Sequence, residues 1–348
     1  EANPEVFPNL TEMAAEGAGG PMNSIVPPES SACWPSLTTG TNPGKTGVYG
    51  FQDREVGSYD TYVPMGNDVQ STRLWSRVAE ADRDATVLNV PVTFPPDREP
   101  TRMVSGFLSP AVEKAAVPES FARELEALDY RIDVNAKLGH EADKTAFVED
   151  AHETLDARFE AFRKYLGGDD WDLFFGVFMT TDRVNHFLFE DYERDGEYRE
   201  AFLEFYATVD EYLGALRDQL PEDVTMVVAS DHGFTTLDYE VHLNTWLREE
   251  GWLSYDAEEP EDLADIASET TAYSFIPGRF YLNLEGREPR GSVPESEYES
   301  VRADLTAAIE SLEGPDGRPV VERVVPKEEA FDGEHDAIAP DLVAIPND

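Results

Sequence analysis

The chain alternates between short, continuously apolar runs and longer segments in which apolar residues recur every three to four positions. Continuous apolar runs rich in β-branched and aromatic residues predict buried strands at 85–90, 171–179 and 224–230. Helical spacing of apolar residues predicts long helices at 144–165 and 196–219. Strands that alternate with helices in this way are typical of a doubly wound, mainly parallel α/β sheet flanked by helices.

Weaker patterns predict the remaining elements. The segment 106–168 is polar and mostly helical, and we expect it to form a helical lid inserted into a single domain that spans residues 1–348. Specificity for a ligand is expected in this segment and in the acidic stretch 256–268. Shorter helices are predicted at 6–16, 31–39, 243–250 and 295–312, and shorter strands at 24–26, 279–284 and 342–345.

The charge of the chain excludes several classes of partner. With 27 basic and 72 acidic residues the net charge is −45, and 41% of the residues are hydrophobic, as in a globular protein. Because such a field repels phosphate backbones, we do not expect binding to a nucleic-acid duplex or to an anionic membrane. The carboxylates are spread along the chain, which is typical of a halophilic protein kept hydrated in strong salt. Cation binding is the weaker explanation.

Targeting signals are absent from the sequence given. Its one cysteine, Cys33, excludes an intramolecular disulfide and is typical of a reducing compartment. No apolar run approaches the roughly 18 residues of a membrane span, and no signal peptide is recognisable. We therefore expect a cytoplasmic protein.

Two Asp/His pairs follow predicted strands. Asp231 and His232 come directly after 224–230, and Asp182 and His186 follow 171–179 at a spacing of one helical turn. Taken singly, the first pair is equally compatible with a helix cap beside a hydrogen-bonded histidine, and the second favours a surface ion pair. Ligands bind beyond the carboxyl ends of parallel strands, where oxygen and imidazole ligands suit zinc or a similar ion. The two pairs together predict a site for two divalent metal ions.

A candidate nucleophile lies near the start of the predicted helix 31–39. Ser30 follows a proline pair, where a helix N-terminus would favour an alkoxide or a bound phosphate. The alternative is that Ser30 or Ser31 only caps the helix, the usual role of such a serine. Pro35 falls inside the predicted helix, so we expect the helix to start late or to bend there.

A longer stretch around Ser30 carries a family resemblance. It contains Trp34, Thr39-Gly40 and the sequence Asn-Pro-Gly-Lys at 42–45. From Ser30 to Phe51 it resembles the nucleophile segment of the alkaline phosphatase superfamily, and in particular its type I phosphodiesterase/nucleotide pyrophosphatase branch. The likeness continues in chain order through 89–96, 105–107, 181–186, 230–234, 243–247, 286–289 and 339–342.

The resemblance implies an alkaline phosphatase-like fold and a specific division of labour. A Ser or Thr nine residues before the Thr-Gly attacks phosphorus in that superfamily, and this position is Ser30. Asp182 and His186 would bind one metal, and Asp231, His232 and the Ser30 oxygen the other. A phosphoserine would form and be hydrolysed. Zinc is the usual ion of this branch, and manganese or magnesium occurs among relatives.

The chain also departs from the family pattern. The family uses a further Asp at the end of a first strand and a late His, and we expect both to lie outside this sequence, which would be incomplete at both ends. An Asn that holds the phosphoryl oxygen in relatives is replaced by Phe51, and Thr46 stands where relatives often have His. Lys45 and Gln52 are the nearby candidates for substrate binding. The remaining histidines are predicted to be structural or exposed: His140, His152, His242 and His335.

The leading hypothesis is thus a metal-dependent phosphodiesterase acting on a small-molecule phosphoester. A sulfatase is disfavoured, because Ala32 and Trp34 occupy the places where sulfatases need Pro and Arg. A phosphomonoesterase or phosphonate hydrolase would have the same metal site. A non-catalytic metal-binding relative is the alternative from a different class. The oligomeric state is left open by the sequence.

Overall fold

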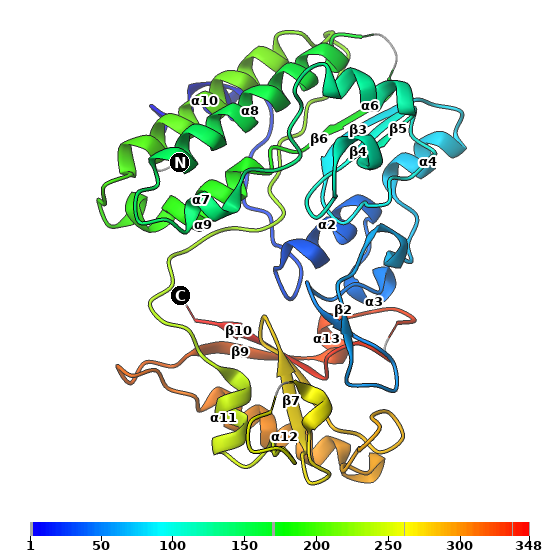
Figure 1. Cartoon of the computed structure of the whole chain (residues 1–348), viewed down its shortest axis with the longest axis vertical. Coiled ribbons are helices and arrows are strands. Elements are labelled where there is room, and N and C mark those ends of the chain that lie inside the picture. Colours follow the sequence, from blue (N-terminus) through cyan, green and yellow to red (C-terminus); the bar gives the residue numbers. More distant parts are fainter. Residues whose placement is uncertain (1–2, 169–170, 261, 336, 348) are drawn as a thin grey trace. The chain divides into compact units, whose positions relative to one another are not determined.

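The computed structural model describes residues 3–168, 171–260, 262–335 and 337–347 and divides into two compact units (Figure 1). Unit 1 comprises Glu1–Asn23, Met65–Asn67 and Thr72–Thr236. Unit 2 comprises Ser24–Pro64, Asp68–Ser71 and Leu237–Asp348. The assignment of the whole chain to a single domain with a lid at 106–168 stays a prediction.

Unit 1 is built on a mainly parallel sheet with the strand order β5-β4-β3-β6. The central strand β3 (Ala85–Val90) pairs in parallel with both β4 (Arg102–Ser105) and β6 (Leu173–Gly176), and the short β5 (Ala116–Val117) pairs antiparallel with β4. This confirms the predicted fold class. The strand predicted at 85–90 is confirmed residue for residue, whereas the one predicted at 171–179 is shorter.

Helices pack on both faces of this sheet. Consecutive side chains of a strand point to opposite faces. In β6, Phe174 joins the core under α6 (Glu119–Glu126) and α8 (Thr145–Leu166), whereas Phe175 meets Trp75 of α4 (Leu74–Glu80) edge to face at 6.1 Å. The predicted helices at 6–16, 144–165 and 196–219 are confirmed. The helices of unit 1 are α1 (Pro8–Glu16), α4 (Leu74–Glu80), α5 (Val112–Ala115), α6 (Glu119–Glu126), α7 (Ala136–Gly139), α8 (Thr145–Leu166), α9 (Thr180–Glu193) and α10 (Arg199–Arg217).

Two predicted strands are wrong. Residues 224–230 form no strand, and Val227 and Val228 are 80% and 48% exposed. The apolar run has the right composition, but a strand also needs a partner for its backbone groups, and within the described chain no strand pairs with it. The segment 24–26 is likewise irregular and is followed by two prolines, which cannot donate to a ladder.

Unit 2 contains a second, antiparallel sheet with the order β7-β8-β10-β9. Its strands are β7 (Ala272–Phe275), β8 (Arg279–Leu282), β9 (Val321–Pro326) and β10 (Leu342–Pro346). The strands predicted at 279–284 and 342–345 therefore exist, but they do not join the parallel sheet.

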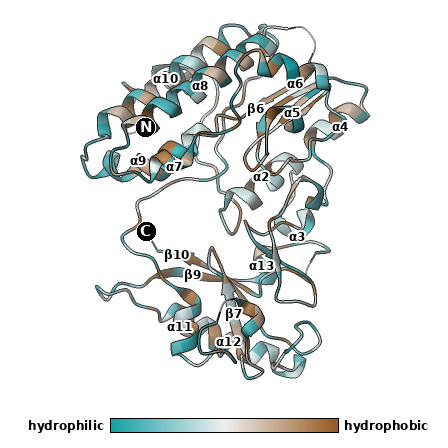
Figure 2. Ribbon diagram, in the orientation of Figure 1, coloured by the Kyte–Doolittle hydropathy of each residue, from teal (hydrophilic) through white to brown (hydrophobic). Residues whose placement is uncertain are grey.

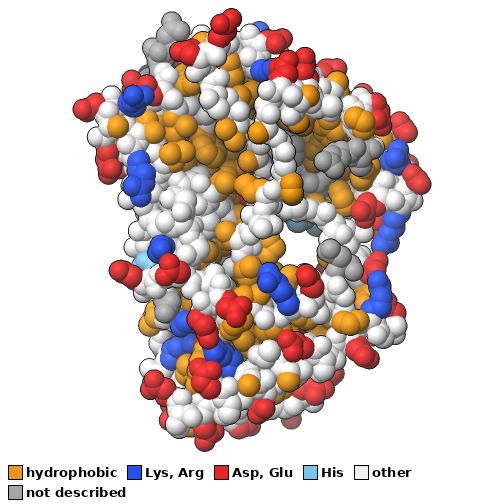
Figure 3. Space-filling model, turned by 180° about the vertical axis from the view of Figure 1, so that it is seen from behind, with side chains coloured by type: hydrophobic (Ala, Val, Ile, Leu, Met, Phe, Trp, Pro, Cys, Tyr) orange, Lys and Arg blue, Asp and Glu red, His pale blue; other side chains and the backbone are white. Residues whose placement is uncertain are grey.

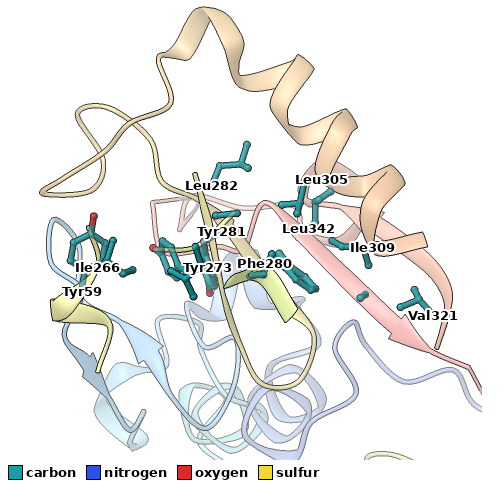
Figure 4. Packing of buried hydrophobic residues seen from close by; sticks show 14 residues of the cluster. Tyr59, Ile266, Tyr273, Phe280, Tyr281, Leu282, Leu305, Ile309, Val321 and Leu342 are labelled. Carbon is teal, nitrogen blue, oxygen red and sulfur yellow. The ribbon is translucent and has the colours of Figure 1, made fainter. Parts of the chain in front are cut away.

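Helices α11 (Leu243–Glu249) and α12 (Tyr298–Glu310) cover this antiparallel sheet and confirm the helices predicted there. The core between them is formed by aromatic side chains of β7 and β8 and by aliphatic side chains of α12, among them Tyr273, Phe280, Leu305 and Ile309 (Figure 4). The smaller elements of unit 2 are α2 (Ser30–Thr39), α3 (Pro43–Thr46), β1 (Asp53–Arg54), β2 (Thr61–Tyr62) and α13 (Lys327–Ala330).

The surface follows the composition. The long helices α8 and α10 carry both hydrophilic and hydrophobic residues, as amphipathic helices do (Figure 2). Asp and Glu side chains are scattered over the visible face rather than gathered in one patch (Figure 3). None of the helices described here combines the length and the apolar composition that crossing a bilayer requires.

Candidate active site

Asp182 and His186 lie one turn apart on α9, which begins shortly after β6 ends. The helical conformation that their spacing required is confirmed, and it brings Asp182 Oδ1 to 3.5 Å from His186 Nε2. The Asp182 side chain is 15% exposed and that of His186 is 53% exposed. The pair therefore presents an imidazole at the surface and a largely buried carboxylate beneath it.

The second pair reaches the same carboxylate from a loop. His232 Nε2 lies 4.0 Å from Asp182 Oδ1 and 3.5 Å from Asp231 Oδ2. The other ring nitrogen, Nδ1, lies 2.7 Å from the carbonyl oxygen of Gly233 and must carry the hydrogen, because a carbonyl only accepts. In the neutral ring Nε2 then presents its lone pair towards both aspartates, the tautomer that a metal ligand requires.

An aromatic contact ties the loop to the helix. The ring of Phe234 lies edge to face with the imidazole of His186 at 5.0 Å and packs against Phe189 at 5.3 Å. Both partners are on α9, so the loop is fastened two residues after His232. The structure therefore brings all four predicted metal-binding side chains of unit 1 together, although 224–230 is not a strand.

The carboxyl of Asp182 has a perturbed acidity. Burial raises its pKa above the ordinary value of 3.8, and the charge of Asp231 adds to this effect. The cationic forms of His186 and His232 and the guanidinium of Arg183 act in the opposite direction but do not outweigh burial. Buried carboxyl groups with a raised pKa are common at functional sites.

The donor atoms fit a divalent cation. Asp182 Oδ1 is buried and accepts no hydrogen bond from any residue that the structure describes. Two carboxylates and two imidazoles are the mixture of donors found at zinc sites. Within the described ranges, however, no three His, Cys, Asp or Glu side chains are already arranged to hold an ion. The two-metal arrangement stays a prediction.

Ser30 is the first residue of α2 in unit 2 and is 7% exposed. The expectation that its hydroxyl caps the helix is wrong, because Glu29 is the N-cap and its carbonyl accepts from the amides of Ala32 and Cys33 at 2.9 and 2.8 Å. Pro35 lies inside the helix, which nevertheless continues from Ser30 to Thr39. Ser30 thus stands in the first turn, where backbone amides have no partner within the helix.

A buried ion-pair network supports the residue before Ser30. Glu29 Oε1 accepts from the amide of Phe51 at 2.9 Å, and Arg279 of β8 donates to Asp53 Oδ1 and to the carbonyl of Gln52, both at 2.6 Å. A side chain at Gly50 would collide with both the Glu29 carboxylate and the Arg279 guanidinium. Sequence reasoning missed this network, because nothing local links residues so far apart in the chain.

The candidate substrate-binding residues lie at the surface of unit 2. Lys45 Nζ is 3.0 Å from Asp332 Oδ2, and the Gln52 side chain is exposed. Their assignment to substrate binding stays a prediction. The rings of His140 and His152 pack edge to face against phenylalanines, at 5.0 and 5.4 Å.

Comparison with known proteins identifies the family. The family model described as type I phosphodiesterase / nucleotide pyrophosphatase matches residues 2–348. The chain belongs to this family, within the alkaline phosphatase superfamily. It is accordingly a phosphoester hydrolase. No curated protein matches it.

Solved structures support the fold. Phosphonoacetate hydrolase from Sinorhizobium meliloti 1021 in complex with phosphonoacetate is 14% identical, with a TM-score of 0.57 over 99% of this chain and 76% of that one. Its complex with phosphonoformate is 15% identical, with a TM-score of 0.59 and the same coverage. At this identity the likeness concerns the fold alone.

Proposed function

We propose that the chain is a metal-dependent phosphodiesterase that uses Ser30 as its nucleophile. The Ser30 hydroxyl oxygen attacks phosphorus, the bond from phosphorus to the leaving oxygen breaks, and the hydroxyl proton is taken up by the departing alcohol. Water then hydrolyses the phosphoserine, which releases the phosphomonoester and restores the Ser30 hydroxyl. The observation that carries the proposal is a cluster in which His186 and His232 both lie within 4.0 Å of the buried Asp182 Oδ1, with Asp231 Oδ2 at 3.5 Å from His232 Nε2. The place of Ser30 in the first turn of a helix supports its role, because amides there favour negative charge.

The four clustered side chains would hold the metal ions, Asp182 and His186 one, and Asp231 and His232 the other. When bound, the ions supply positive charge that stabilises the phosphoryl group during the displacement. Zinc agrees best with the imidazole donors, and manganese and magnesium are the alternatives. The buried Asp182 carboxylate and the Nε2 lone pair of His232 are what the protein itself contributes.

The substrate is proposed to be a small-molecule phosphodiester, with Lys45 and Gln52 as candidate contacts. Phosphonate hydrolysis is the second candidate, because the solved structures of similar fold are phosphonoacetate hydrolases. A lid at 106–168 and a cytoplasmic location complete the proposal.

The test compares Ser30→Ala with Ser31→Ala, a neighbour that is also buried in α2. Hydrolysis of bis(p-nitrophenyl) phosphate, p-nitrophenyl phosphate, a sulfate ester and phosphonoacetate is measured in molar salt with zinc or manganese. We expect the diester to be the best substrate and Ser30→Ala to lower kcat by at least about 10³-fold, as the loss of a nucleophile does. Ser31→Ala should retain most activity. Undiminished cleavage by Ser30→Ala would contradict the nucleophile assignment.

A further inference from the structure

An open, apolar hollow of about 520 Å³ lies in unit 1, between the end of β4 and the start of α5. Residues 107–112 form most of its wall, and Ile132 and Asp133 complete it. All of these side chains are apolar except Ser109 and Asp133. The hollow falls in the range of about 300–1,000 Å³ that is typical of small-molecule sites.

Arg183 connects this hollow to the candidate metal cluster. It follows Asp182 on α9, and its NH1 lies 3.9 Å from Asp182 Oδ2. Its NH2 and Nε donate to Asp133 Oδ2 at 2.7 and 3.2 Å, and its Cζ lies 4.4 Å from the centre of the Phe107 ring. Asp133 and Phe107, two residues of the wall, thus both contact Arg183, which is the neighbour of the candidate metal ligand Asp182.

The wall is held at the carboxyl end of the parallel sheet. Gly106 donates its amide to the carbonyl of Val90 at 2.9 Å, and a Cβ at Gly106 would collide with the backbone of Asn89. The loop is therefore fastened where β3 and β4 end, the edge at which α/β sheets bind their ligands. The hollow has a firm wall on the same edge as the Asp/His cluster.

Leu108 is unusual in this wall. Its φ of 68° lies in the left-handed region, which costs a leucine roughly 1–2 kcal/mol. Its side chain is 45% exposed, so burial does not offset that strain. Strained residues of this kind cluster at ligand sites, where the conformation places a side chain for binding. Here the strain leaves an aliphatic side chain uncovered at the hollow.

We propose that the hollow binds the uncharged, apolar ester group of the diester substrate. This inference rests on the proposed function and adds the class of substituent that the enzyme selects. The apolar wall favours burial of such a group, whereas the net charge of −45 disfavours a second anionic group. Arg183 positions the wall through Asp133 and Phe107.

The test measures binding without turnover. Isothermal titration of diphenyl phosphate and of dimethyl phosphate is carried out on the full-length Ser30→Ala protein with zinc, alone and combined with Leu108→Asp or Leu74→Asp. Leu74 is the matched control, because it is a leucine of unit 1 with a similar exposure, 40%, at the start of α4. Asp tolerates a positive φ better than Leu, so Leu108→Asp is not expected to unfold the loop.

We expect diphenyl phosphate to bind about tenfold more tightly than dimethyl phosphate, since burial of a ring adds apolar contact. Leu108→Asp should lower the ratio of the two affinities at least about fivefold, because it places a charge in the wall. Leu74→Asp should leave this ratio unchanged. Equal affinity for the two ligands, or a preference that survives Leu108→Asp, would overturn the inference. Failure of the proposed function would show separately, as absent diester cleavage by the wild type.

Discussion

Asp182 Oδ1 lies 4.0 Å from His232 Nε2, although one residue belongs to helix α9 and the other to a loop that follows the irregular apolar segment 224–230. The contact joins two Asp/His pairs that are each unremarkable alone. The candidate metal cluster of unit 1 thus depends on how α9 and this loop are held together. The ring of Phe234 against His186 provides that connection.

Removal of one imidazole should weaken metal binding. We expect His186→Ala and His232→Ala each to lower zinc affinity by more than about 100-fold. Loss of a residue that only supports a metal ligand already costs up to about 100-fold, and loss of the ligand itself should cost more. His140→Ala is the control, because that histidine packs against Phe187 on the same helix as His186. Zinc content after dialysis is the measurement. Equal zinc retention by all three variants would contradict the ligand assignment.

Asp182→Asn should stabilise the metal-free protein and lower its zinc affinity. Because burial raises the pKa of Asp182, its ionised form destabilises the fold as pH rises through that pKa, and this penalty is absent below 3.8. We expect the free energy of unfolding to rise by about 0.5–2 kcal/mol at pH 7 and the gain to vanish near pH 3. Urea denaturation in a chelator measures it, with the exposed Asp129→Asn as control. A less stable Asn variant at pH 7 would refute the argument.

The buried ion pair of Arg54 and Glu288 should be costly to break. The side chains are 1% and 0% exposed, and the two charged atoms are 3.1 Å apart. Arg54→Met leaves the Glu288 carboxylate with one cationic partner, Arg287, besides its bonds from Tyr273 and Leu284. We therefore expect a loss of about 3 kcal/mol of unfolding free energy, the lower end for a buried pair. The surface pair of Arg123 and Glu119 is the control, and Arg123→Met should cost less than about 1 kcal/mol. Equal losses would show that the buried pair is not special.

Gly50→Ala should disturb the segment that precedes Ser30. The new methyl group would collide with both Glu29 and Arg279, and overpacking of this kind costs about 1–3 kcal/mol. Gly20→Ala is the control, because nothing lies within 4 Å of its Cβ position. We expect Gly50→Ala to lower kcat on the diester as well as the thermal midpoint. A wild-type kcat in Gly50→Ala would show that the buried ion-pair network does not influence the candidate nucleophile Ser30.

Much of the fold could be predicted from local pattern. Helix α8 and strand β3 were predicted closely, because spacing and composition act within each segment. The strand predicted at 224–230 failed because strand formation depends on a partner elsewhere in the chain. The separate antiparallel sheet of unit 2 was missed for the same reason, since pairing direction is not encoded within one strand.

In the candidate site, too, local features could be predicted from the sequence and contacts between distant residues could not. The spacing of Asp182 and His186 predicted their shared helical face, which is a local property. The Arg279–Asp53 pair could not be predicted from the sequence, because charged residues usually lie at the surface and these two residues are far apart in the chain. Ser30 was placed at the helix start, but which residue serves as the cap depends on backbone geometry that composition does not specify.

The buried charges of unit 2 have a consequence for how the stability of this unit responds to salt. Mobile ions screen the interaction between solvent-exposed charges, whereas buried pairs are screened much less. The Arg279–Asp53 and Arg54–Glu288 contacts should therefore keep their strength at low and high salt concentration alike. Salt should therefore weaken the exposed pairs, such as Arg123–Glu119, more than the buried framework next to Ser30.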